Sequence, residues 1–186
     1  MKFNTHHQLI GKHAVMSASK YHWINYTPER MAESFRTAQA AALGTRLHDF
    51  AAEAITLGIK MPRNKKTINS YINDAIGFRM QPEQVLYFSD RCFGTVDTIS
   101  YEPRNQLLRI HDLKTGVIPA HFEQLEVYTA LFCLEYGFKI PEIDVELRIY
   151  QNDDILMHAP EDGKIMHIMD RIITFDKMIQ DIQSEA

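Results

Sequence analysis

The chain has 186 residues, of which 45% are hydrophobic and 24% are charged, and its formal net charge is −4 at pH 7. This composition excludes wholesale disorder, and the length suits one domain over residues 1–186. No apolar run approaches the roughly 20 residues that span a bilayer, and the N-terminus lacks a signal-peptide layout, so we expect an intracellular protein without membrane contact.

The first part of the chain is predicted to be helical. Residues 17–26 predict a short helix with an aromatic face. Thr27-Pro28-Glu29 combines a capping hydroxyl, a proline at the first helical position and an acid in the first turn, which marks a helix start. This helix should continue to about Gly58, with Gly44-Thr45 as a point where it breaks or is capped again. A second helix is predicted from Ile68 to Ile76, ending at Gly77.

The pattern then changes to that of β-strands. Runs rich in β-branched and aromatic residues predict three strands, at Gln84–Phe88, Gly94–Tyr101 and Gln106–Leu113. Glu102-Pro103-Arg104-Asn105 has proline at the second position of a type I turn. The second and third strands should therefore form a hairpin.

Helical spacing returns over residues 119–136 and stops at Gly137. A half-buried strand is predicted from Ile143 to Tyr150 and an amphipathic helix from Ile165 to Ile182. Because the fourth strand follows a helical crossover, it should run parallel to another strand. The predicted fold class is α/β, a small mixed sheet in the order helix, three strands, helix, strand, helix, with helices on both faces.

Charged residues in two of these strands suggest a metal-dependent site. Asp97 lies in the second strand, and Asp112 and Lys114 end the third. Residues two apart on a strand share a face and lie about 6.6 Å apart, and the hairpin brings Asp97 toward Asp112. A hard cation such as Mg²⁺ or Mn²⁺ relieves the repulsion between two carboxylates. Lys114 can then orient water and stabilise negative charge developing on a phosphate.

Taken singly, these residues have ordinary interpretations, since an Asp-x-Lys pair is usually a solvated strand end and a histidine such as His48 usually packs in the core. Their combination resembles the PD-(D/E)xK nuclease superfamily, and more narrowly its RecB-like exonuclease branch. The four matching motifs of this chain are Gly44-Thr45-Arg46-Leu47-His48, Gly94-Thr95-Val96-Asp97, Asp112-Leu113-Lys114-Thr115-Gly116 and Gln124-Leu125-Glu126-Val127-Tyr128. The spacing Ser17-x-Ser19-x-x-x-Trp23 also resembles the opening helix of many members.

The resemblance implies a restriction-endonuclease-like core and a role for each motif. It implies four metal ligands: the side chains of His48, Asp97 and Asp112 and the backbone carbonyl of Leu113. Lys114 would position or activate the attacking water. Gln124 and Tyr128 share one helical face, which would point toward the metal site and the DNA strand. Glu83, just before the first strand, offers a further acid, whereas His111 should point to the opposite face from Asp112.

The chain departs from the branch in its cysteines. Many members hold an iron–sulfur cluster through four cysteines, whereas this chain has only Cys92 and Cys133, with Tyr26 where a first cysteine is expected. We expect no iron–sulfur cluster, and both thiols reduced and packed as small apolar groups.

The sequence therefore predicts an Mg²⁺- or Mn²⁺-dependent deoxyribonuclease, an exonuclease acting on DNA ends or single strands in recombination or repair. Its small size suggests a phage or mobile-element origin and a recombination or replication protein as a further partner. The acidic net charge is unusual for such a protein, since phosphate binding usually leaves a basic surface. Two alternatives stay open: a non-catalytic nucleic-acid- or partner-binding module with the same fold, and a small domain acting on a phosphorylated or carboxylated small molecule.

Overall fold

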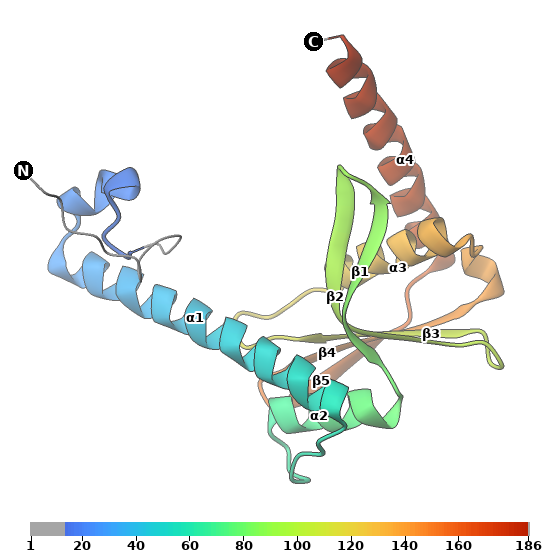
Figure 1. The fold of residues 1–186 in the computed structure, drawn as a ribbon, viewed down its shortest axis with the longest axis horizontal. Coiled ribbons are helices and arrows are strands. Elements are labelled where there is room, and N and C mark those ends of the chain that lie inside the picture. Colours follow the sequence, from blue (N-terminus) through green and yellow to red (C-terminus); the bar gives the residue numbers. More distant parts are fainter. Residues whose placement is uncertain (1–13, 186) are drawn as a thin grey trace, which may run out of the picture. The chain divides into compact units, whose positions relative to one another are not determined.

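The computed structural model describes residues 14–185 (Figure 1). The predictions for the first residues of the chain lie outside the described residues. By its internal contacts the chain divides into two compact units, residues 1–45 and residues 46–186. The second unit contains the sheet and the candidate site. The expectation of a single domain stays a prediction.

The first unit contains the predicted short helix and the start of the long one. The short helix is a 3₁₀ helix, η2 (Ala18–Asn25), with a kink at Lys20, where φ is −109° and ψ is 49°. The indole Nε1 of Trp23 donates a hydrogen bond of 2.9 Å to the carbonyl of Ser17. The cap predicted at Thr27 is confirmed, since its hydroxyl accepts the N–H of Arg30 at 3.3 Å.

Helix α1 (Pro28–Leu57) is continuous, so the predicted break at Gly44-Thr45 was wrong. A glycine inside a helix costs only about 1 kcal/mol relative to alanine, which an alanine-rich helix tolerates. The hydroxyl of Thr45 donates to the carbonyl of Ala41 at 3.2 Å, one turn back in the same helix, and caps nothing. The helix ends where predicted, with Gly58 in the left-handed conformation at φ 67°.

The second unit is a five-stranded mixed sheet with helices. After α2 (Thr67–Gly77), its elements are β1 (Gln81–Ser89), β2 (Cys92–Glu102), β3 (Leu107–Leu113), α3 (Glu123–Tyr136), η3 (Ile140–Glu142), β4 (Asp144–Gln151), β5 (Asp154–His158) and α4 (Asp162–Ser184). The strands lie in sequence order, β1-β2-β3-β4-β5. Strands β3 and β4 are parallel and all other neighbours are antiparallel, which confirms the predicted hairpin and crossover.

Two details of the second unit were not predicted. The edge strand β5 follows β4 through a two-residue turn, Asn152-Asp153, whose φ angles of 53° and 59° fit the tight turns of β-hairpins. Helix α3 begins four residues later than predicted, because the buried Gln151 holds the preceding loop. Its side-chain amide donates to the carbonyls of Gly116 and Ile118 and accepts the N–H of Ala120.

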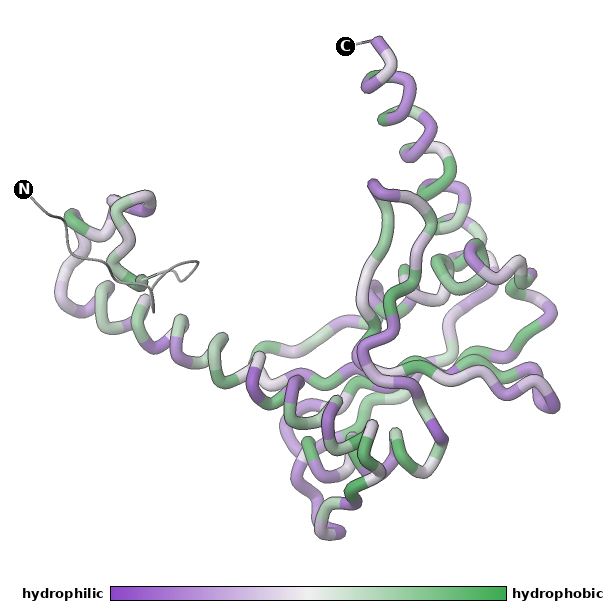
Figure 2. Tube along the Cα trace, viewed as in Figure 1, coloured by the Kyte–Doolittle hydropathy of each residue, from purple (hydrophilic) through white to green (hydrophobic). Residues whose placement is uncertain are grey.

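Apolar residues pack on both faces of the sheet, which confirms helices on both faces (Figure 2). One cluster joins Leu108 and Ile110 of β3 to α3 and α4. It includes Cys133, whose thiol has a pKa raised to about 11 by burial, as expected for a packed thiol. The other cluster joins Leu113 and Tyr150 to α2 and the end of α1. Across residues 14–185, every helix is too short or too polar to cross a membrane.

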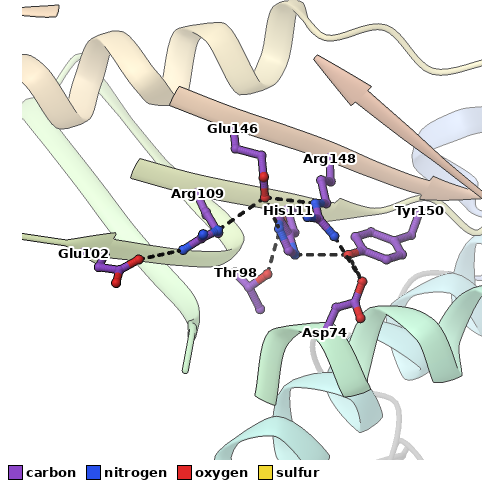
Figure 3. A network of polar contacts seen from close by, with 8 residues as sticks. All are labelled: Asp74, Thr98, Glu102, Arg109, His111, Glu146, Arg148 and Tyr150. Atoms are coloured by element: carbon purple, nitrogen blue, oxygen red, sulfur yellow. Dashed lines mark hydrogen bonds and ion pairs between the residues drawn. The ribbon is translucent and has the colours of Figure 1, made fainter. Parts of the chain in front are cut away.

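A polar network lies on the α2 side of the sheet (Figure 3). The hydroxyl of Tyr150 donates to Asp74 of α2 at 2.7 Å, and Arg148 contacts the same carboxylate at 3.3 Å. His111 is fully buried in this network, and burial, together with Arg148 and Arg109, lowers its pKa to about 3. The predicted orientation of His111, away from Asp112, is confirmed, and this histidine belongs to the packing of α2 on the sheet.

A buried carboxylate joins α3 to α4 and β5. Glu126 is fully buried, and its Oε2 lies 2.7 Å from Nζ of Lys164 in α4. Its Oε1 lies 3.4 Å from Nε2 of His158 in β5. Removing one partner of such a pair is strongly destabilising, because the remaining charge is buried without compensation.

Lys164→Met is therefore expected to lower the melting temperature by at least about 4 °C. Lys177→Met, on the same helix but outside any ion pair of the described residues, should change it little. In a Glu126→Gln background, Lys164→Met should have almost no effect, because no buried charge is left to compensate. Thermal unfolding followed by circular dichroism measures the wild type and the four variants, and equal effects of Lys164→Met in both backgrounds would contradict the pairing.

Candidate metal centre and active site

Three carboxylates lie side by side on the first three strands of the sheet. The register of β1 and β2 places Glu83 opposite Asp97. Thr98 of β2 pairs with His111 of β3. The next position in the same register places Asp112 opposite Asp97. Cross-strand neighbours in an antiparallel sheet share a face and have their Cβ atoms about 5 Å apart. The hairpin predicted from sequence thus brings Asp97 and Asp112 together, and β1 adds Glu83.

Glu83 occupies its place in this row with a strained backbone. Its φ angle is 51°, in the left-handed region that non-glycine residues rarely adopt. Such a conformation costs of the order of 1–3 kcal/mol and occurs preferentially at functional sites. The sequence offered Glu83 only as a further acid, because nothing in its local pattern announces an unusual φ.

His48 reaches the row from α1. Its Nδ1 lies 3.4 Å from Oδ2 of Asp97. Ligand atoms of His48, Glu83 and Asp97 all lie within 4.8 Å of one another, close enough to hold one metal ion. The predicted association of His48 with Asp97 is therefore seen in the structure. Asp112 lies outside this triad and contacts Lys114 instead.

The titration properties of the cluster reflect crowded negative charge. A hydrogen bond to Asp97 raises the pKa of His48, against the opposing effect of burial. Loss of water, followed by the charge of Asp97, raises the pKa of Glu83. Burial, followed by the charge of Asp97, also raises the pKa of Asp112, with Lys114 opposing. The cluster therefore retains protons unless another positive charge replaces them.

Asp97 is fixed by the backbone of the neighbouring strand. Its Oδ2 accepts the N–H of Leu113 at 2.8 Å, beyond the point where the backbone pairing of β2 and β3 ends. The side chain of Leu113 is buried in the core on the α2 side, which holds this peptide in place. The bond places the Leu113 peptide beside the carboxylate row. The role of its carbonyl as a metal ligand stays a prediction.

Lys114 joins the sheet to α3. Its Nζ lies 3.0 Å from Oδ1 and 2.9 Å from Oδ2 of Asp112, a carboxylate only 5% exposed. The same ammonium donates to Oε1 of Gln124 at 2.9 Å. An ammonium group has three N–H donors, so the two partners leave one donor for a substrate or a water.

A chain of hydrogen bonds continues from Gln124 along α3. Since lysine can only donate, Oε1 of Gln124 must face Lys114, and its Nε2 donates to the hydroxyl of Tyr128 at 3.2 Å. That hydroxyl donates in turn to the carbonyl of Thr95 at 2.6 Å. The i, i+4 spacing predicted for Gln124 and Tyr128 therefore fixes the orientation of Lys114 relative to β2.

The hydrogen bonds of Tyr128 require glycine at position 94, because the Tyr128 ring lies directly against Gly94. A Cβ atom at position 94 would lie 2.8 Å from Cε1 of Tyr128, closer than real Cβ contacts. This close approach explains physically why glycine stands three residues before Asp97. Sequence reasoning placed Gly94 in a motif without identifying its partner, which only the packing of α3 on β2 reveals.

The donor set fits a hard divalent cation. One imidazole and several carboxylates are suitable ligands for Mg²⁺ or Mn²⁺. His48, Glu83 and Asp97 would hold the ion, with Asp112 and the Leu113 peptide adjacent. Comparison of the chain with protein-family models, with curated proteins and with solved structures found no match.

Metal affinity is expected to rise between about pH 6 and pH 8, because the raised pKa of His48 leaves a proton on the ligand that the metal must displace. Calorimetric titration with Mn²⁺ in two buffers of different ionisation enthalpy should show proton release that is larger at the lower pH. His48→Asn should remove most of this proton release. An affinity independent of pH would contradict the assignment of His48 as a ligand.

Gly94→Ala and Tyr128→Phe should impair the site through the same contact. Each breaks the hydrogen bond from Tyr128 to the carbonyl of Thr95 and frees Lys114 to reorient, and a misplaced catalytic group can cost about 100-fold in rate. Their combined effect on kcat should be close to that of either change alone. Tyr136→Phe, at the exposed end of the same helix, is the control. Fully additive losses would show that the two residues act separately.

Proposed function

We propose that the protein is a divalent-metal-dependent nuclease that hydrolyses phosphodiester bonds in DNA. The observation that carries the proposal is the row of Glu83, Asp97 and Asp112 beneath His48, with Lys114 beside it. A purely structural cluster of this kind would be unfavourable, since burial and the charge of Asp97 raise the pKa of both Glu83 and Asp112, and no lysine or arginine pairs with Glu83 or Asp97 among the described residues.

The proposed metal is Mg²⁺ or Mn²⁺. When bound, it would neutralise the carboxylates, polarise the phosphate and lower the pKa of water. His48, Glu83 and Asp97 supply its ligands. Asp112, which is almost fully buried, keeps Lys114 in place at the edge of this site.

Lys114 is proposed to position the attacking water and to stabilise the phosphate. Two of its donors are held by Asp112 and Gln124, so the third has a fixed direction. A preoriented cation stabilises the charge that develops on phosphate oxygens without reorganising during the reaction. Gln124 and Tyr128 act as positioning residues, because they contact Lys114 directly or in sequence.

The substrate preference and family rest on the four motifs. The geometry agrees with the roles that the resemblance to RecB-like exonucleases implies for His48, Asp97 and Lys114, and the mixed sheet with an α3 crossover is compatible with a restriction-endonuclease-like core. We therefore propose an exonuclease acting on DNA ends or single strands, in recombination or repair, that works without an iron–sulfur cluster.

Lys114→Ala is expected to lower the rate of DNA cleavage by about 100- to 1,000-fold, because it removes the positioned cation. The assay uses end-labelled single- and double-stranded DNA with Mn²⁺, Mg²⁺ or EDTA in parallel, and EDTA should abolish cleavage by the wild-type protein.

Lys139→Ala is the matched control, since Lys139 forms an exposed ion pair with Glu142 far along the chain from the site. The Lys114→Ala protein should melt at a lower temperature, because the buried Asp112 loses its partner, but it should remain folded at the assay temperature and bind Mn²⁺ at least as well as the wild type. Cleavage that survives Lys114→Ala would refute the proposed mechanism. Metal binding without any cleavage by the wild type would support the non-catalytic alternative.

A further inference from the structure

Positive charge in this acidic chain is concentrated in one segment beside the candidate site. Residues 54–73 contain four of the chain's 20 lysines and arginines and none of its 24 acids. All four lie in residues 60–66, Lys-Met-Pro-Arg-Asn-Lys-Lys, which we call the basic segment and which connects α1 to α2 (Figure 2). Lys60, Arg63, Lys65 and Lys66 are all exposed.

None of these four cations forms an ion pair with another described residue. Among residues 14–185, six of the 14 other lysines and arginines form ion pairs, whereas none of the four in the basic segment does. Their charge is therefore not neutralised within the described chain. Uncompensated lysines and arginines on one face are typical of phosphate-binding surfaces.

The basic segment is held in one conformation by the side chains of α2. Asn73 binds both backbone groups of Met61, at 2.9 and 3.0 Å. Asn69 donates to the carbonyl of Pro62 and to the side chain of Asn64, whose oxygen also accepts the N–H of Lys66. A loop fixed in this way loses less conformational entropy when it binds a ligand.

A groove of about 400 Å³ connects the basic segment to Lys114. Lys66 and Lys114 both line it, and Leu47 and Ile68 contribute apolar surface. The groove therefore reaches the segment just after β3 that carries Lys114. A groove lined by apolar side chains and by two lysines suits a nucleotide, whose base is flat and largely apolar and whose phosphates are charged.

We propose that this groove binds the single DNA strand next to the phosphate being cleaved, with Lys66, Lys65 and Arg63 contacting successive backbone phosphates. The inference rests on the proposed function and specifies where the strand lies. It also accounts for DNA binding by a chain with a net charge of −4, because the positive charge is placed along one path.

One acid in the groove restricts where the phosphates lie. Oδ1 of Asp153 accepts both the N–H and the hydroxyl of Thr67, at 2.8 and 3.0 Å. This carboxylate already occupies the N-terminus of α2 and would repel a phosphate there. The strand backbone therefore follows Lys66 and the basic segment, and the N-terminus of α2 is not part of the binding site.

The test compares two triple variants with the same change in net charge. The first is Arg63→Gln, Lys65→Gln and Lys66→Gln in the basic segment. The control is Arg104→Gln, Lys139→Gln and Lys177→Gln, at exposed positions on other elements. Binding of fluorescein-labelled oligothymidylate, with Ca²⁺ as the metal, is measured by fluorescence anisotropy over a series of salt concentrations.

The basic-segment variant should bind at least about 30-fold more weakly near physiological salt, and the slope of log affinity against log salt should fall by about 2, since each lost single-strand contact removes about 0.7. The control variant should lose less than about fivefold. Equal losses in the two variants would overturn the proposal, because they would reflect net charge alone. Equally effective competition by polyglutamate would overturn it in favour of an acidic protein partner.

Hydrolysis of thymidine 5′-(p-nitrophenyl phosphate) with Mn²⁺ separates this proposal from the proposed function. This substrate has no neighbouring phosphates, so the basic-segment variant should cleave it as fast as the wild type. Loss of that activity in the variant would show that the substitutions disturb the catalytic site and would overturn the groove assignment. If the wild type cleaves neither this substrate nor DNA, the nuclease proposal fails, and the binding measurement still decides whether DNA occupies the groove.

Discussion

Repulsion among neighbouring carboxylates is the constraint around which the second unit is organised. Glu83, Asp97 and Asp112 stand in one row, and each needs a means of staying in place. Asp97 accepts a backbone N–H from Leu113, Asp112 is held by Lys114, and Glu83 is held by a left-handed backbone. Strain and desolvation of this kind persist only where the surrounding fold overdetermines them, here by apolar clusters on both sides of the sheet.

The supports of the site divide between the two faces of the sheet. His48 comes from α1, whose last turns pack with α2, whereas Gln124 and Tyr128 come from α3 on the other side. Asp97 and Asp112 lie between these supports, at the end of the β2–β3 pairing. The carboxylates and their orienting residues can therefore come together only when both layers have packed, so the site depends on the complete unit rather than on any one motif.

Most of the fold was predictable because its signals are local. The turn at Glu102–Asn105, the left-handed Gly137 and the parallel β4 follow from residue type and connection rules. Asp97, Asp112 and Lys114 were predictable because a hairpin fixes which residues face each other. The short strand β5 and the late start of α3 were not, since the first rests on a two-residue turn and the second on a buried glutamine from another strand.

The features of the site that the sequence did not predict are those that depend on contacts between distant segments or on an unusual backbone conformation. Glu83 has no sequence signal for its left-handed φ, and the contact between Gly94 and Tyr128 joins residues 34 positions apart. The same limit explains why an acidic net charge does not exclude the proposed DNA ligand. Net charge sums over the chain, whereas a charged ligand responds to the local field within about a Debye length. Acids gathered in the proposed metal centre, with cations gathered in the basic segment beside it, give an acidic total and a local region of positive charge at the same time.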